Sequence, residues 1–215
     1  MKKHLFSLAI AIMMAAAFIA CKKNDSSNNE DNANPSGSTY DAGVVIGGIK
    51  WATRNVGTPG TFAAAPENVG MYYQWNRRTG WPATGDVTGW NSYGATGDTW
   101  EKANDPCPPG WRVPTVDEFK VLATVSIEWR ADPFGYVLGG GGNAIFLPVA
   151  GLRDYSSGAG GFNGVGYGNS TGGAYWSATP GSVTFSYFLQ LYNSIVSVDE
   201  SLNRAYGLMV RCVAE

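Results

Sequence analysis

The stretch DPCPPGWRVPTVDEF, from Asp105 to Phe119, contains the signals around which the rest of the sequence can be organised. Its Pro-Pro-Gly is typical of a turn, and Thr115 followed by Glu118 forms a capping box, in which each side chain binds the other residue's backbone N–H. We therefore expect a helix from about residue 116 to residue 124. Its inward face would consist of Val116, Phe119 and Ala123.

The N-terminal segment MKKHLFSLAIAIMMAAAFIAC has a basic start and a short apolar run that ends in small residues. This pattern is typical of a secretory signal rather than of a membrane span. The cysteine directly after the small residue resembles the bacterial lipoprotein signal. That resemblance implies a signal over residues 1–20, acylation of Cys21, and a lipid-anchored location in the cell envelope, on the outer membrane surface. An ordinary secretory signal with an incidental cysteine is the alternative.

Loss of the signal would remove His4, the single histidine of the chain. Nucleophiles, general bases and metal sites that need histidine would then be excluded. Removing Lys2 and Lys3 from the 15 basic residues leaves 13 against 17 acidic residues, so the formal charge changes from −2 to −4. A mildly acidic surface argues against nucleic acid as a partner.

Disulfides persist outside the cytoplasm, and acylation of Cys21 would leave Cys107 and Cys212 as the remaining pair. We expect a bridge between them that ties the segment before the helix to the last strand. Closing so long a loop contributes roughly 4–5 kcal/mol in the chain-entropy description. Two buried free thiols are the alternative.

Residues 22–39 contain no large apolar side chain, so we expect a lipidated cysteine and disordered tether over residues 21–39. Residues 40–215 suit one domain that is rich in glycine and contains all 8 tryptophans. We expect the α+β class, with long Gly- and Trp-rich loops over residues 80–104 and 158–173. Trp111 and Trp176 are expected in the core. The expected strands cover residues 44–51, 70–75 (strand or short helix), 144–153, 174–179, 183–192 and 205–213.

Alternation in the last two of these strands predicts which side chains face the core. In residues 183–192 the inward set would be Val183, Phe185, Tyr187, Leu189 and Leu191. In the last strand, Leu208, Val210 and Cys212 would face one way, and Met209 and Arg211 the other.

Six segments occur in the order seen in the Fibrobacter succinogenes major paralogous domain, and the chain resembles this lipoprotein-type family over residues 44–213. These segments are IKWATRNVG, GMYYQW, CPPGWRVPTVDEF, LPVAGLR, GGAYWSATP and YGLMVRCV. The resemblance implies a C-type lectin-like fold, with a twisted mixed or antiparallel sheet, two helices and long loops. A bridge between the helix region and the last strand is at home in that fold.

Two related activities are not expected. The stretches PEN (residues 66–68) and WNS (residues 90–92) depart from the motifs with which C-type lectins bind sugar through calcium. WRVPTVDEF also resembles the formylglycine-generating enzymes, but these need a reactive cysteine pair, which distant and bridged cysteines would not supply.

The tail from residue 174 resembles variable proteins that retroelements diversify, in which aromatic and amide side chains alternate with fixed apolar ones. Such side chains supply adaptable contact area, as they do in antibody paratopes. The outward, ligand-binding set would then be Phe188, Gln190, Tyr192, Asn193, Asp199, Asn203, Tyr206 and Met209.

No dinucleotide or phosphate-loop motif occurs, so we expect no cofactor and assign no metal ligands. A calcium site built from loop Asp and Asn side chains stays open. The sequence therefore predicts a lipid-anchored recognition protein without catalytic activity. Its partner would be a protein or glycan on another cell, a phage or the host. The alternatives are an acid-based extracellular enzyme that acts on glycans and a structural surface component without a discrete ligand.

Overall fold

The computed structural model describes residues 37–160 and 172–215, which belong to one compact unit of the chain. The predicted signal over residues 1–20 and the acylation of Cys21 lie outside the described residues. Ser38, near the end of the predicted tether, already belongs to the folded unit, because its carbonyl accepts the N–H of Phe62 at 2.7 Å. No helix within the described ranges is long and apolar enough to cross a membrane.

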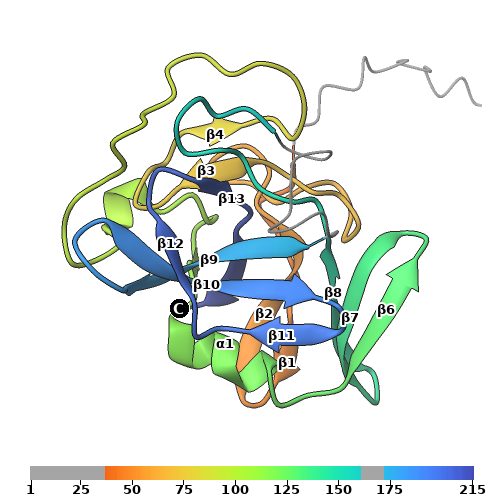
Figure 1. Ribbon diagram of the computed structural model, residues 1–215. Helices are drawn as coiled ribbons and strands as arrows, with labels where there is room; N and C mark the ends of the chain where they lie inside the picture. Colours follow the sequence, from red (N-terminus) through yellow and green to blue (C-terminus); the bar gives the residue numbers. More distant parts are fainter. Residues whose placement is uncertain (1–36, 161–171) are drawn as a thin grey trace, which may run out of the picture. The chain divides into compact units, whose positions relative to one another are not determined.

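The unit is a β-rich fold of short, mostly antiparallel strands, with a single α-helix among the described residues (Figure 1). Four strands form the first sheet, in the order β1-β2-β14-β5. The last strand of the chain therefore lies between strands from its first third and its middle. The bounds are Val44–Ile46 for β1, Ile49–Asn55 for β2, Trp111–Arg112 for β5 and Arg211–Ala214 for β14.

Strand β10 organises the second sheet, because it pairs with β9, β11 and β12. The third sheet has the order β6-β7-β8, and its β6–β7 hairpin lies at the right-hand edge of Figure 1. The fourth sheet has the order β13-β3-β4. The bounds are Tyr72–Gln74 (β3), Gly80–Trp81 (β4), Ile127–Ala131 (β6), Phe134–Gly140 (β7), Asn143–Pro148 (β8), Gly173–Pro180 (β9), Phe185–Tyr192 (β10), Ile195–Ser197 (β11), Ser201–Asn203 (β12) and Gly207–Leu208 (β13).

Helix α1, Val116–Leu122, confirms the predicted capping box. The Thr115 hydroxyl accepts the Glu118 N–H at 3.3 Å, and the Glu118 carboxylate accepts the Thr115 N–H at 2.7 Å. The helix ends earlier than expected, with Ala123 as an exposed C-cap, so Leu122 takes the inward position instead. The expected second helix is absent from the described residues, which contain only one further helical turn, the 3₁₀ turn η1 at Lys102–Asn104.

Two apolar clusters lie on the two sides of the central strands, which corrects the predicted strand faces. Leu189 and Leu191 of β10 pack in one cluster, and Phe188 packs in the other. Val183 and Phe185, expected inside, lie 68% and 40% exposed at the β9–β10 turn. In the last strands Met209 joins the first cluster and Leu208, Val210 and Cys212 the second. A strand with a core on each side is apolar on both faces, so alternation alone does not show which face meets solvent.

Strand boundaries also differ from the expectations. The segment predicted as one strand over residues 44–51 is the β1–β2 hairpin, because Gly47 and Gly48 turn the chain with φ of 58° and 83°, which favour glycine. The segment over residues 205–213 divides into β13 and β14. The β6–β7 hairpin was not predicted. Trp111 and Trp176 are buried, as expected.

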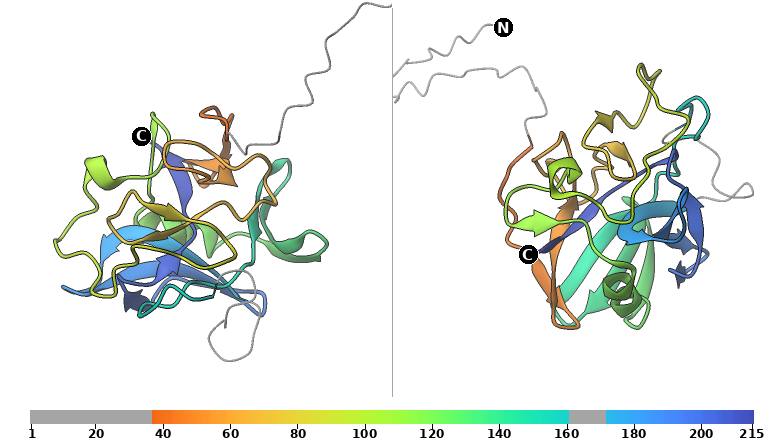
Figure 2. Two further views of the ribbon diagram at one scale, coloured as in Figure 1. Left: turned by 90° about the horizontal axis from the view of Figure 1, so that it is seen from above. Right: turned by 90° about the vertical axis from the view of Figure 1, so that its left-hand side faces the viewer.

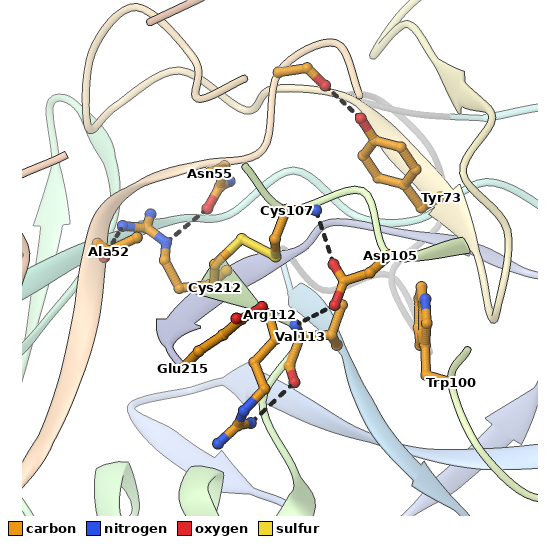
Figure 3. Close-up of a disulfide and its surroundings, with 12 residues drawn as sticks. Ala52, Asn55, Tyr73, Trp100, Asp105, Cys107, Arg112, Val113, Cys212 and Glu215 are labelled. Atoms are coloured by element: carbon orange, nitrogen blue, oxygen red, sulfur yellow. Dashed lines mark hydrogen bonds between the residues drawn. A yellow bond between two sulfur atoms is a disulfide. The ribbon is translucent and has the colours of Figure 1, made fainter. Parts of the chain in front are cut away.

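The disulfide between Cys107 and Cys212 is confirmed and joins the segment before α1 to β14 (Figure 3). The Cα atoms of the two cysteines lie 6.1 Å apart. The Asp105 carboxylate, beside the bridge, accepts the N–H of Cys107 at 2.8 Å and that of Val113 at 3.1 Å. The turn that leads into the helix is therefore held both covalently and through a buried carboxylate.

Arg211, the neighbour of Cys212, is fully buried and has neutral acceptors on two other strands. Its guanidinium donates to the Asn55 side chain at 2.9 Å and the Ala52 carbonyl at 3.0 Å, both on β2, and to the Phe146 carbonyl on β8 at 2.9 Å. Burial lowers the pKa of Arg211 to about 10, so the side chain remains charged at neutral pH. The carbonyl dipoles replace the water that this charge loses.

Asp41 is a second buried charge, placed at the start of the folded unit. Its carboxylate accepts the N–H of Gly43 at 2.8 Å, the N–H of Thr53 at 3.1 Å and the Arg54 Nε at 3.2 Å. Burial alone would raise the pKa of this carboxyl, but the hydrogen bonds outweigh burial and hold its pKa below the usual value.

Replacing both Cys107 and Cys212 by alanine should lower the free energy of unfolding by about 2–5 kcal/mol, because the unfolded chain gains the freedom that the bridge removes. Urea unfolding of the two proteins measures the difference. Two titratable thiols at these positions in the unfolded, unreduced protein would contradict the prediction.

The Asp41→Asn variant should be less stable than the parent protein at pH 7 by about 1–3 kcal/mol. The folded-state pKa of Asp41 is lowered, so its contribution is complete above the unfolded value of 3.8 and is lost as pH falls through the folded value. The stability difference should therefore shrink between pH 4 and pH 2 in a urea titration series. A difference that stays constant over this range would show that the carboxylate charge does not carry the effect.

Candidate ligand-binding site

The structure buries two of the eight residues predicted to bind ligand. Phe188 is 4% exposed and Met209 is fully buried, so their predicted outward position is wrong. Phe188 packs in the cluster of Trp176 and Trp75, and Met209 packs in the cluster of Trp51. Their burial follows from the central position of β10 and of the segment between β13 and β14, which have core on both sides.

The other six residues do not form one surface. Gln190 and Tyr192 are half-buried at one end of β10, and Asn193 is exposed in the following turn. Asn203 pairs with Phe185 at the opposite end of β10, roughly 23 Å away at the usual rise of a strand. Asp199 is exposed between β11 and β12, and Tyr206 is half-buried against Tyr155, with ring centroids 5.2 Å apart.

A different part of the unit forms a hollow of ligand size. An open cleft of about 460 Å³ lies between the β3–β4 turn and the long connection that follows β4. Figures 1 and 2 show this connection, in yellow-green, as a long excursion on the side of the unit that carries β3, β4 and β13. Ligand pockets in proteins commonly enclose 300–1,000 Å³. The cleft is lined by Asn76, Arg77, Arg78, Thr79, Gly94, Ala95, Thr96 and Asn104.

The first wall of the cleft is the β3–β4 turn, which Asn76 shapes. Asn76 has a φ of 52°, in the left-handed region that asparagine tolerates better than most residues. Its side-chain oxygen accepts the N–H of Glu101 at 2.9 Å and the side-chain amide of Asn104 at 3.2 Å. The turn and η1 are thus held together, and Arg77 and Thr79 extend from a fixed backbone.

The second wall, residues 94–96, is held by the buried side chain of Arg204. Its guanidinium donates to the Gly97 carbonyl at 2.7 Å and to the Ser182 carbonyl at 2.6 Å. It also lies 3.9 Å from the ring centroid of Trp75, a cation–π contact. Gly94 has a φ of 72°, and a Cβ there would lie 3.0 Å from the backbone nitrogen of Ala205. The wall is therefore positioned without regular secondary structure.

Arg153 holds the rest of the long connection in the same way. Its buried guanidinium donates to the carbonyls of Pro82 at 2.6 Å, Gly85 at 3.0 Å and Gly158 at 2.6 Å. Burial lowers the pKa of Arg153 and of Arg204 from the usual value. Both guanidiniums are enclosed by backbone oxygens, so both are committed to holding loops.

The cleft has a positive and polar lining. Six of its eight lining residues have polar side chains, two of these are arginines, and none of the eight is acidic. Arg78 donates to the Asp105 backbone carbonyl at 2.6 Å, which places its guanidinium. The Arg77 Nε is buried and has no hydrogen-bond partner. Tyr93, next to the cleft wall at Gly94, is 90% exposed.

One wall of this cleft could have been recognised from the sequence. The stretch Asn76-Arg77-Arg78-Thr79 is a polar turn with two adjacent cations between two aromatic segments. The opposite wall has no comparable signal, because residues 94–96 are Gly-Ala-Thr and are held by the distant side chain of Arg204.

A second exposed surface, on the β6–β7 hairpin, is aromatic. Trp129 and Phe134 lie edge to face with ring centroids 4.6 Å apart, and they are 36% and 38% exposed. The Tyr136 hydroxyl beside them accepts the Ser194 N–H at 3.0 Å. These rings extend the core to the edge of the sheet, so their position follows from packing.

A smaller hollow of about 280 Å³ lies beside the disulfide and includes Asp105, Arg112 and Glu215 (Figure 3). Burial raises the pKa of the Asp105 carboxyl above its usual value. Its two oxygens each accept a backbone N–H, so this acid is committed to the turn before α1. Within residues 37–160 and 172–215, no group of three or more acidic, histidine or cysteine side chains is placed to hold a metal ion.

No protein-family model matches the chain, and neither does any curated protein or any solved structure.

The Arg204→Lys variant should loosen the second wall, because a lysine ammonium does not reproduce the planar array of donors. The NMR order parameters of the backbone amides of residues 94–97 should fall, since these residues lose their anchor. The same substitution at Arg130, an exposed side chain paired with Glu128 on β6, provides the control. Unchanged order parameters in the Arg204→Lys variant would show that Arg204 does not hold the wall.

Proposed function

We propose that the chain is a recognition protein of the cell envelope, anchored through an acylated Cys21 on the outer membrane surface, that binds its ligand in the cleft between residues 76–79 and 94–96. The single observation that carries this proposal is a preformed polar hollow whose walls are held by partly buried side-chain hydrogen bonds. Preorganised walls reduce the ordering cost of binding.

We further propose a C-type lectin-like fold for the unit. Three features support it: the bridge from the segment before α1 to the last strand, the capped helix that follows, and the long connection between β4 and η1. The proposal moves the binding site from the C-terminal strands to this connection, because the strands bury Phe188 and Met209.

The partner in this proposal is a ligand on another cell, a phage or the host, bound without catalysis. The size of the cleft suits a compact group or the end of a chain better than a flat protein surface. Protein interfaces depend on buried aromatic or aliphatic anchors, and the only apolar side chain in the lining is that of Ala95.

Thr96→Trp should abolish binding, because an indole at this exposed position fills the cleft. The purified full-length protein and the variant are applied to glycan and protein arrays, and the affinity for each ligand found is measured by calorimetry. Thr88→Trp, an equally exposed position in the same connection that does not line the cleft, is the matched control.

Both variants should keep the melting temperature of the parent protein within about 2 °C, because surface substitutions usually change stability little. If the Thr96→Trp variant binds a ligand as tightly as the parent protein does, the binding site for that ligand lies elsewhere. Trp129→Ala would then test the aromatic surface of the β6–β7 hairpin.

A further inference from the structure

Three arginines of this unit are fully buried, and half-buried Arg77 differs from them in its hydrogen bonds. Arg153, Arg204 and Arg211 each donate to three or more oxygens. The Arg77 Nε, in contrast, is buried without an acceptor. An unpaired buried donor is unfavourable, and in native proteins such a group often indicates a functional role.

A second unpaired atom lies in the same segment. The Gln74 side-chain oxygen is buried and has no donor, although its amide nitrogen donates to the carbonyls of Asn91 at 2.6 Å and Ala205 at 2.7 Å. Two of the three buried, unpaired side-chain atoms among the described residues therefore belong to the β3–β4 hairpin, and the third is the Trp51 indole nitrogen. The unsatisfied polar groups are concentrated next to the cleft.

The two arginines of the cleft also lack a salt-bridge partner among the residues described, although Arg78 attracts the buried Asp105 carboxylate. Arg77 and Arg78 are adjacent, and neither forms a salt bridge within the described part of the chain. The acid nearest in the hydrogen-bond network is Asp105, which meets Arg78 through its backbone carbonyl while its carboxylate holds two backbone N–H groups. Two positive charges at one turn repel each other unless an anion lies between or beside them.

We propose that the cleft binds the anionic group of an acidic glycan, a carboxylate or sulfate on a terminal sugar. Arg77 and Arg78 are the residues that bind this group. This inference rests on the proposed function and names the class of ligand. A guanidinium group can donate two parallel N–H bonds to two oxygens of either anion. The hydroxyl groups of Thr79 and Thr96 line the same cleft and suit the hydroxyl groups of the sugar.

A glycan fits better than an acidic peptide for a reason given by the lining. A peptide gains affinity from apolar anchors, whereas this lining offers hydroxyl, amide and guanidinium groups, with Ala95 as its single apolar side chain. The exposed ring of Tyr93, next to Gly94, can add stacking against a sugar ring without any further hollow.

Matched pairs of saccharides test the inference on the purified full-length protein by calorimetry. One pair is an oligogalacturonate and its methyl ester, which removes the carboxylate charge. The other pair is a sulfated oligogalactan and its desulfated form. We expect at least one charged member to bind about tenfold or more tightly than its neutral partner, because hydrogen bonds to charged groups are the stronger ones.

Variants at Arg77 identify the group responsible. Arg77→Lys keeps the charge but lacks the forked donors, and Arg77→Ala removes both, so each should remove most of the preference for the charged saccharide. Because Arg77 Nε has no partner to lose, neither variant should lower the melting temperature. Arg130→Ala, at an exposed arginine on β6, is the control and should keep the preference.

A direct signal comes from the Nε–H resonance of Arg77 in an ¹⁵N-resolved NMR spectrum, assigned by its absence in Arg77→Lys. Inorganic sulfate should shift this resonance downfield at concentrations that leave the spectrum of Arg130 unchanged. An Arg77 resonance that sulfate leaves unmoved would overturn the inference.

The remaining outcomes separate the inference from the proposed function. If the charged and neutral saccharides bind equally and Thr96→Trp displaces both, the cleft is a binding site but the anionic class is wrong. If no saccharide binds and the array yields another ligand that Thr96→Trp displaces, the glycan inference fails and the recognition function stands. If Thr96→Trp displaces no ligand, the cleft itself is not the binding site.

Discussion

The buried guanidinium of Arg211 is the interaction on which the assembly of this fold depends. It lies on the last strand, beside the disulfide-bonded Cys212, and its acceptors are on β2 and β8. A buried charge is tolerated only where oxygens replace its water. A shift of β14 by one residue would move the guanidinium to the opposite face and leave the charge unsolvated. One side chain thus sets the register of the last strand in the first sheet and connects that sheet to the third.

Buried guanidinium groups also hold the loops in place. Arg153 and Arg204 gather the carbonyls of segments that form almost no regular strands, and each replaces several backbone hydrogen bonds that a sheet would have supplied. A Gly-rich connection has a large conformational entropy to lose on folding. Five fixed donors on one planar group can hold several turns of such a chain at once. The cleft therefore has rigid walls although its second wall is irregular.

Arg77 differs from these buried arginines in its hydrogen bonds. Its neighbours in the chain are fixed by the turn at Asn76 and by the contact between Arg78 and Asp105, yet the Arg77 Nε is left without a partner. The guanidiniums of Arg153, Arg204 and Arg211 hold the fold, whereas Arg77 lines the cleft and its buried Nε has no acceptor. This difference, rather than the number of exposed aromatic residues, separates the candidate site from the aromatic surface on β6 and β7, whose rings continue the core.

Local signals in the sequence determined the elements whose cause is local. Thr115 and Glu118 specify the start of α1 because the two halves of a capping box lie three residues apart. The pairing of Cys107 with Cys212 was predicted because the third cysteine, Cys21, was assigned to acylation. Apolar runs predicted much of the strand content, although Gly47 and Gly48 turned one expected strand into a hairpin.

Only the tertiary structure decided which faces are buried and where the cleft lies. Phe188 and Met209 alternate with inward residues exactly as surface residues would, so no local pattern distinguishes a strand with solvent on one side from a strand with a second core there. The cleft brings residues 76–79 together with residues 94–96, which a guanidinium from residue 204 holds, and with residue 104, which the Asn76 side chain holds. Contacts between residues that are more than a hundred positions apart depend on how separate elements pack. The sequence contains the residues that make these contacts, but it does not show that they meet.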